Sequence, residues 1–221
     1  MDTLSGVGVL DKAMSVLRAV EVGGPLTLQE LQDRTGLPRA TAHRLAAALT
    51  DHGLMRRDES GAYVLGWALV GLGRAAEHHT PLLELAAPIM EQLRTGTGES
   101  VQLYVREADM RRCVRSLESP HGLRWIVPEG ALLPLSVGSA GRLLSGSPVT
   151  RGGWLASVGE REAGVASVSA PVLDATARIV AALSVSGPIE RLSRRPGDRH
   201  GAAVVTAARR LSTGLRRSPR R

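Results

Sequence analysis

The sequence has few of the aromatic residues on which several nucleic-acid-binding proteins depend. It contains no phenylalanine, and aromatic residues make up 2% of its 221 positions. Proteins that bind single strands stack the unpaired bases on aromatic side chains. The scarcity of such side chains therefore argues against single-stranded DNA or RNA as the main ligand.

Cysteine and lysine each occur once, as Cys113 and Lys12. A lone cysteine has no intrachain partner for a disulfide, and on a strand it is typical of a small core residue. The surroundings of the lone lysine exclude a Gly-Lys-Ser/Thr phosphate loop and a Ser-x-x-Lys acylation motif. Since no Cys–His or paired-carboxylate constellation stands out either, we expect a protein that is not an enzyme.

Long apolar runs are also missing. No stretch approaches the roughly 20 residues that span a bilayer, and residues 1–6 lack the basic start of a secretory signal. We therefore expect a cytoplasmic protein without a membrane segment. A hydrophobic fraction of 43% and a charged fraction of 22% are typical of a folded chain, and the length allows two small domains.

The histidines show no spacing that would suit a metal ion. His52, His121, His200 and the pair His78–His79 are scattered with respect to Cys113 and the acidic residues. Zinc sites need ligands at short and regular spacing. We therefore expect neither a metal site nor a cofactor.

The net charge of +7 is distributed unevenly. Residues 1–66 carry seven basic and eight acidic side chains, a net charge of −1, whereas residues 209–221 hold six arginines and no acid. The end of the chain, residues 218–221, is expected to be a solvated basic tail. Bulk charge therefore does not identify a nucleic-acid partner, and the placement of individual arginines has to do so.

The N-terminal quarter predicts two helices in succession. Apolar residues recur at helical spacing from Leu10 to Val20, and the run ends at Gly23–Pro25. Thr27 and Glu30 then form a capping box at the start of a second helix. Gly36 follows that helix at a position that suits the left-handed conformation.

A third helix is predicted from Pro38, placed at its first position, to Gly53. On a helical wheel, one face is apolar and the opposite face is formed by Ala40, His43, Arg44 and Ala47. Two short strands, residues 54–57 and 62–65, flank a turn at Asp58–Gly61. Three helices followed by a hairpin indicate a winged helix-turn-helix, whose third helix enters the major groove of duplex DNA.

The remaining residues predict connecting helices and then a mixed domain. Helical spacing covers residues 67–79 and 82–93, and Pro88 either kinks the second helix or lies in its first turn. Period-two patterns predict strands, and a helix from Gly201 to Leu215 ends the α+β domain. The expected strands are 100–106, 110–117, 123–127, 154–158, 164–173 and 179–186. The expected domains are 1–66 for DNA binding, 67–98 as linker, 99–217 for effector binding and 218–221 as tail.

Four segments resemble the IclR family of bacterial transcriptional regulators along nearly the whole chain. They are Leu37–Leu45 in the third helix, Tyr63–Gly66 at the end of the wing, and Gly164–Val172 and Ala181–Pro188 in the second domain. The resemblance implies a winged helix-turn-helix, a linker helix and a GAF-like effector domain with an antiparallel sheet and helices. It also implies a ligand-responsive regulator that binds double-stranded DNA.

A narrower resemblance is to the NdgR-type regulators of amino-acid metabolism, including leucine biosynthesis, in actinobacteria. It rests on Ser5–Ala13, Gly159–Glu162 and Gly187–Leu192. The family resemblance further implies a homodimer, or a dimer of dimers, on an approximately palindromic promoter site. We expect the DNA contacts to come from the second helix, the third helix and the wing: Thr27, Arg39, Ala40, Thr41, His43, Arg44, Arg56 and Arg57.

The resemblance also implies that the second domain binds a small metabolite, such as an amino acid or a keto acid. The effector residues it implies are Ser139, Ala140, Ser157, Val165, Ser167, Ser184 and Ser186. We expect Gly138–Gly141 to form a turn whose backbone N–H groups, with the hydroxyl groups, hold a carboxylate without a fixed cation. Relatives that bind small keto acids have an aspartate and a cysteine where this chain has Ser157 and Ser167.

One departure from the family lies between Leu144 and Gly153, where a further helix and loop are normally present. We expect part of the pocket wall to be missing there. Two alternatives to the ligand-responsive regulator stay open. One is a DNA-binding regulator with a degenerate pocket, and the other is a non-catalytic small-molecule-binding protein that uses the helix-turn-helix for dimerisation.

Overall fold

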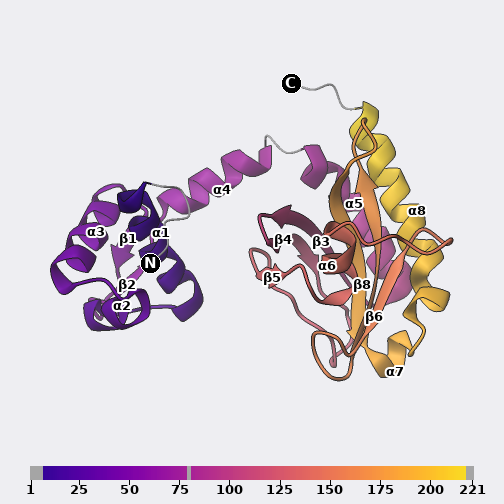
Figure 1. The fold of residues 1–221 in the computed structure, drawn as a ribbon, viewed down its shortest axis with the longest axis horizontal. Helices are drawn as coiled ribbons and strands as arrows, with labels where there is room; N and C mark the ends of the chain where they lie inside the picture. Colours follow the sequence, from indigo (N-terminus) through magenta and orange to yellow (C-terminus); the bar gives the residue numbers. More distant parts are fainter. Residues whose placement is uncertain (1–6, 79–80, 218–221) are drawn as a thin grey trace. The chain divides into compact units, whose positions relative to one another are not determined.

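The computed structural model describes residues 7–78 and 81–217 of the chain (Figure 1). The expected basic tail at 218–221, and the side chains of the pair His78–His79, lie outside this description. The chain divides into two compact units, residues 1–79 and 80–221. Within the described ranges, no helix is long and apolar enough to cross a membrane.

The first unit contains the predicted helices and hairpin in the predicted order. Its elements are α1 (Gly8–Gly23), α2 (Leu28–Thr35), α3 (Arg39–Asp51), β1 (Met55–Arg57), β2 (Tyr63–Leu65) and α4 (Ala68–His78). The strands β1 and β2 pair antiparallel, with Arg56 opposite Val64. This arrangement confirms the winged helix-turn-helix.

Local sequence signals explain where the helices of this unit begin and end. The Thr27 side chain accepts a hydrogen bond from the Glu30 backbone, and the Glu30 carboxylate accepts one from the Thr27 backbone at 2.7 Å, which completes the capping box. Gly36 ends α2 in the left-handed region with φ of 66°. Pro38 precedes α3 as its N-cap residue, so the prediction that it occupies the first helical position is wrong by one residue.

The helices of the first unit share one apolar core. Leu31 from α2 and Ala42 and Ala46 from α3 are fully buried with Val16 of α1. Small alanine side chains on the inner face of α3 let its backbone approach its neighbours closely. The opposite face of α3 is thereby fixed toward the outside of the unit.

The second unit is a six-stranded antiparallel sheet with helices. Its elements are α5 (Pro81–Thr97), β3 (Ser100–Glu107), β4 (Met110–Leu117), β5 (Leu132–Pro134), α6 (Gly138–Leu144), β6 (Leu155–Val158), β7 (Val165–Leu173), β8 (Ile179–Pro188), α7 (Ile189–Leu192) and α8 (Pro196–Arg217). The strand order is β5-β4-β3-β8-β7-β6. The α+β prediction is confirmed.

The two faces of this sheet differ because side chains alternate along each strand. Val168, Leu183 and Val185 point to one face and pack with residues of α5 and α8 in the main core. The neighbouring residues on the same strands point to the other face, which α6 covers, and several of them are serines. Figure 1 shows α5 and α8 running alongside the sheet. The serine-lined face is where the second unit differs from a purely apolar sandwich.

Three local predictions for the second unit are corrected. Residues 123–127 form no strand, because Leu123 and Ile126 are exposed and Pro128 follows; the edge strand is β5. Gly138–Gly141 is the start of helix α6 rather than a turn. Pro88 lies inside the continuous helix α5, which contributes buried residues to the main core.

Cys113 lies on β4 and is completely buried in the smaller core beside α6. Burial, followed by the charge of Glu129, raises the pKa of its thiol to about 12. A thiol with so high a pKa carries almost no thiolate at neutral pH and is unreactive. Cys113 therefore acts as a small core residue.

Candidate functional site

The outer face of α3 presents the expected contact residues to solvent. Arg39, Ala40, His43 and Arg44 are exposed, and Thr41 is half-buried. Neither Arg39 nor Arg44 takes part in an ion pair within the described part of the chain. Their guanidinium groups are therefore available for phosphate oxygens or guanine edges, the two acceptors that arginine contacts in DNA.

The wing holds its two arginines through its own aromatic residues. The Arg57 guanidinium donates hydrogen bonds to the Tyr63 hydroxyl at 2.6 Å and to the Gly61 carbonyl at 3.0 Å. The Arg56 guanidinium lies 5.1 Å from the centre of the Trp67 ring. These contacts order both side chains beside the hairpin, so little further rotamer freedom is lost if they meet a ligand.

The turn of the wing is closed by Asp58. Its carboxylate accepts hydrogen bonds from the Ser60 hydroxyl at 2.7 Å and from the backbone of Ser60 and Ala62. The bond from the Ser60 side chain is the largest contribution that holds the pKa of Asp58 below its ordinary value. The wing is therefore a defined structure rather than a loose loop.

Thr27 is exposed at the start of α2, where its hydroxyl is engaged in the capping box. The distance from the Thr27 hydroxyl to the Glu30 carboxylate is 2.8 Å. A role for Thr27 in helix capping is therefore visible in the structure. A DNA contact by the same residue is an additional prediction.

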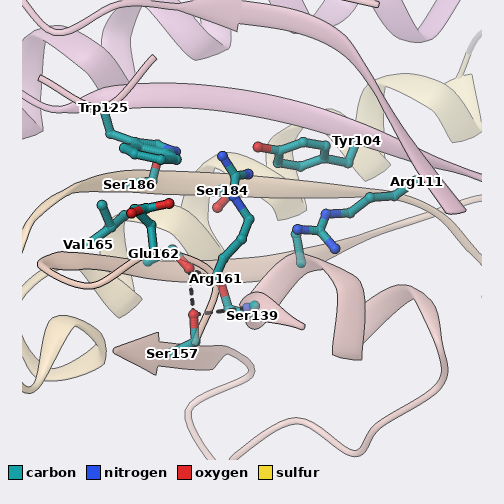
Figure 2. Close-up of a pocket in the computed structure, with 13 residues that line it drawn as sticks. Tyr104, Arg111, Trp125, Ser139, Ser157, Arg161, Glu162, Val165, Ser184 and Ser186 are labelled. Atoms are coloured by element: carbon teal, nitrogen blue, oxygen red, sulfur yellow. Dashed lines mark hydrogen bonds between the residues drawn. The ribbon is translucent and has the colours of Figure 1, made fainter. Parts of the chain in front are cut away.

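In the second unit, a pocket opens on the serine-lined face of the sheet beside α6 (Figure 2). All seven expected effector residues line it: Ser139, Ala140, Ser157, Val165, Ser167, Ser184 and Ser186. They come from α6 and from three neighbouring strands. The period-two alternation along β7 and β8 brings the serines to one face, as the pattern of the sequence predicts.

The serine hydroxyl groups bind one another in a continuous chain. Ser139 Oγ lies 2.7 Å from Ser167 Oγ and 2.8 Å from Ser169 Oγ. Ser167 Oγ is also 2.9 Å from Ser157 Oγ, and Ser169 donates to Ser184 at 2.9 Å. The polar floor of the pocket is therefore satisfied internally, which removes much of the cost of burying these groups.

Five further residues line the pocket that the sequence did not identify. They are Tyr104, Arg111, Trp125, Arg161 and Glu162. Arg111 comes from β4, Trp125 from the β4–β5 connection and Arg161 from the β6–β7 connection. Figure 2 shows the Arg161 side chain reaching toward Tyr104 and Trp125, and its guanidinium lies 4.7 Å from the centre of the Trp125 ring.

A signal for Arg111 was present in the sequence. Arg111 precedes Cys113 by two positions, and side chains two apart on a strand point to the same face. Because Cys113 is expected in the core, the Arg111 side chain is expected to point to the same buried face of the strand. Trp125 and Arg161 come from connections without regular spacing, and no comparable signal exists for them.

The expected carboxylate site without a cation is wrong in two respects. First, Arg111 and Arg161 both line the pocket. Second, the backbone N–H of Gly138 donates to the Glu160 carboxylate at 2.9 Å, and that of Ser139 donates to Ser157 Oγ at 3.2 Å. The backbone groups are thus occupied within the protein, and the positive charge comes from arginine side chains.

Arg111 is buried to an unusual degree for a charged residue, with 2% of its surface exposed. One terminal nitrogen donates to the carbonyl groups of Pro134 and Val137, while Nε has no partner within the described structure. Burial lowers the pKa of Arg111, and the nearby Arg161 lowers it further. Burial also raises the pKa of Tyr104, which faces both guanidinium groups.

Metal ligands do not gather in the described ranges: no three His, Cys, Asp or Glu side chains lie close enough to hold an ion. The polar groups that line the pocket include serine hydroxyls in mutual contact, the two arginines and the exposed carboxylate of Glu162. No histidine, which would activate a serine as a nucleophile, is among the described residues that line the pocket.

Two family models match the chain. The model described as the IclR helix-turn-helix domain matches residues 9–59. The model described as the C-terminal part of bacterial transcriptional regulator IclR matches residues 74–150 and 147–213. The two matched segments meet inside the stretch from Leu144 to Gly153, where the sequence predicts a shortened domain.

Three relatives illustrate the similarity. The chain is 32% identical over 131 residues to the HTH-type transcriptional regulator KipR of Bacillus subtilis, which covers 59% of this chain and 52% of KipR. It is 25% identical over 245 residues to BhcR of Paracoccus denitrificans, covering 95% of this chain and 88% of BhcR. A solved IclR homologue from Microbacterium hydrocarbonoxydans, in complex with 4-hydroxybenzoate, has a TM-score of 0.80 at 23% identity, covering 95% and 100%.

The alignment with BhcR also indicates that this chain lacks some residues relative to that protein. It extends over 245 positions, although the covered 95% of this chain is about 210 residues. A deficit of this size agrees with the expected absence of a helix and loop.

The winged helix with its exposed arginines, the pocketed α+β domain and the matches to both family models lead to one conclusion: the chain belongs to the IclR family of DNA-binding transcriptional regulators with a ligand-binding C-terminal domain.

Proposed function

We propose that this protein regulates genes of amino-acid metabolism, including branched-chain and leucine metabolism, in response to a small organic acid. The observation that carries the DNA-binding part is the exposed face of α3, with Arg39, His43 and Arg44 free of ion pairs in the described structure while the opposite face is buried. Residues near the start of a recognition helix meet base edges in the major groove. This regulation takes place in the cytoplasm, where the DNA is accessible.

Arg44 and Arg39 contact guanine edges or phosphates, and His43, Ala40 and Thr41 complete the surface that faces the groove. Arg56 and Arg57 of the wing contact the sugar-phosphate backbone or the minor groove, as wings and arms of DNA-binding domains do. Thr27 adds a phosphate contact at the start of α2. This division separates base reading by α3 from positioning by the wing.

The protein acts as a homodimer, or as a tetramer of two dimers, on an approximately palindromic operator. Large apolar side chains on α1 and at the start of α4 support self-association. Val9 is 66% exposed and Trp67 is 74% exposed, and Leu10, Val70 and Leu72 are exposed as well. Several exposed apolar residues on two helices of one small unit favour burial against a second copy. Because one nearly neutral DNA-binding domain offers few arginines, a second copy doubles the number of arginines that contact the operator.

The effector is an organic acid such as an amino acid or a keto acid, bound in the pocket of the second unit. Arg111 supplies a donor for a carboxylate, and Tyr104 and Trp125 supply an apolar wall. The IclR homologue solved with 4-hydroxybenzoate binds a molecule that also carries a carboxylate and an apolar body. This likeness supports an acid as the ligand class.

A regulator with a degenerate pocket is the second candidate, and one observation favours it. The free cavity volume is about 30 Å³, close to the space of a single water. The shortened stretch between Leu144 and Gly153 agrees with such a loss. Under this alternative the protein binds its operator, and small molecules do not change that binding.

An electrophoretic shift of the region upstream of its own gene tests the proposal. We expect retardation of that duplex and release, or tighter binding, when leucine, valine, isoleucine or their 2-oxo acids are added at millimolar concentration. A shift that neither these acids nor dicarboxylic acids change favours the degenerate pocket. No shift of this duplex, together with no occupied sites in a genome-wide occupancy experiment, contradicts DNA regulation.

A further inference from the structure

The buried hydrogen-bonding groups that remain unused in and beside the effector pocket are donors. The serine hydroxyls are bound to one another, whereas Arg111 Nε is buried without a partner in the described structure. On β3, next to Ser186, the Nε2 atom of the fully buried Gln102 also lacks a partner, although its Oε1 accepts from Ser186 at 2.7 Å. Unpaired buried donors call for an acceptor.

The two cations of the pocket are not neutralised by the protein. Neither Arg111 nor Arg161 forms an ion pair in the described ranges. Glu160, which adjoins Arg161 in sequence, is held by Arg142 at 2.9 Å and by the Gly138 backbone. Glu162 lines the pocket from an exposed position without pairing with either arginine. The guanidinium groups of Arg111 and Arg161 repel each other in this small pocket, and an anion bound between them offsets the repulsion.

The two arginines differ in depth. Arg111 is 2% exposed and is anchored to the carbonyls of Pro134 and Val137. Arg161 is partly exposed on the short connection between β6 and β7. This connection contains Gly159 and Gly164, both with positive φ. One cation is therefore fixed inside the pocket, and the other is carried by a connection at its rim.

We propose that the effector is a small dianion, whose two carboxylate groups or their equivalents bind Arg111 inside the pocket and Arg161 at its rim. The inference rests on the proposed effector function of this pocket and narrows it. An amino acid places an ammonium group beside two guanidinium groups, which repel it. A dicarboxylic acid, with or without an oxo group, neutralises both cations and uses the free donor of Arg111.

The same geometry explains why the cavity is small. Its volume is about 30 Å³, and the Arg161 guanidinium lies against the ring of Trp125 (Figure 2). A stacking contact between a cation and a ring is weaker than a charge-assisted bond to a carboxylate. A dianion therefore displaces Arg161 from Trp125 and binds it again through the outer carboxylate.

Isothermal titration calorimetry of the full-length protein tests the inference with glutarate and pentanoate, which have equal carbon chains and differ in one carboxylate. The aromatic pair phthalate and benzoate repeats the comparison at constant ionic strength. We expect the dicarboxylate of at least one pair to bind at least tenfold more tightly. Arg161→Gln is expected to remove this preference.

Arg151→Gln is the matched control, since Arg151 is exposed and does not line the pocket; this variant should keep the preference. Equal affinity of wild-type protein for both members of each pair overturns the inference, as does a preference that survives Arg161→Gln. Absence of heat with every dicarboxylate from two to six carbons at millimolar concentration also overturns it. The shift of the upstream duplex does not depend on these acids, so it reports separately on the proposed function.

Discussion

The Glu99 carboxylate binds the Arg191 guanidinium through two parallel hydrogen bonds, from Nε at 2.6 Å and from Nη2 at 2.8 Å. The Glu99 side chain is 4% exposed, so this pair joins the start of β3 to α7 in a nearly dry environment. Glu99 is also the first cause of the raised pKa of Arg191. A bidentate pair of this kind fixes geometry as well as charge.

Arg191→Ala is expected to destabilise the second unit by about 3 kcal/mol, because it leaves a buried carboxylate without its partner. Urea unfolding of the full-length protein, followed by tryptophan fluorescence, measures the change. Arg178→Ala serves as the control, since Arg178 is 74% exposed in its ion pair with Asp174. This exposed pair should contribute less than about 1 kcal/mol. Equal losses of unfolding free energy in the two variants would show that burial of Glu99 does not determine how much its ion pair contributes to stability.

Removal of the Thr27 hydroxyl is expected to loosen the start of α2. A capping threonine contributes about 1 kcal/mol relative to alanine, so Thr27→Ala should accelerate hydrogen exchange in residues 28–35 about fivefold. Thr27→Ser keeps the hydroxyl and should exchange like the wild type. If Thr27 also contacts phosphate, Thr27→Ala binds DNA more weakly under conditions where α2 is fully formed. Unchanged exchange in Thr27→Ala would refute the role of the cap.

His200 predicts a dependence of stability on pH. Burial lowers its pKa below the ordinary 6.5, Arg199 adds to the lowering and Glu99 opposes it. The unfolded chain therefore binds more protons than the folded protein as the pH falls through 6.5, and the contribution of the neutral ring to stability is complete above that pH and lost below it.

Urea unfolding at about pH 7.5 and at about pH 5.5 measures this contribution. Carboxylates also titrate toward acid pH, so the informative quantity is the difference between wild type and His200→Gln. The wild type should lose more stability than His200→Gln over this interval. An equal loss in both proteins would mean that His200 accepts a proton in the folded state without penalty.

The elements best predicted from sequence are those determined by neighbouring residues. Thr27, Glu30 and Gly36 specify the ends of α2 through hydrogen bonds within a few positions. The serines of β7 and β8 reach one pocket because the period of a strand is two. In both cases the structure follows from local geometry, so a single sequence contains the necessary information.

The parts that could not be predicted depend on contacts between distant segments. Arg161 and Trp125 lie 36 positions apart in connections without regular spacing, and only the folded sheet brings them together. The expected strand at residues 123–127 is wrong for a related reason. Its apolar residues suit a strand, but strand β5 pairs with β4 at that edge instead. The contribution of Arg161 to the positive charge of the pocket depends on these long-range contacts, so the sequence alone does not predict it.

The central claim is that the exposed face of α3 reads the sequence of a duplex. Fluorescence anisotropy with a duplex recovered from genome-wide occupancy, and with a scrambled duplex of equal length, tests it for wild type, Arg44→Ala and the control Arg209→Ala. Arg209 is exposed on α8. The account predicts at least hundredfold discrimination by wild type and Arg209→Ala, and a loss of at least tenfold in specific affinity for Arg44→Ala. Equal binding of the recovered duplex by wild type and Arg44→Ala would contradict it.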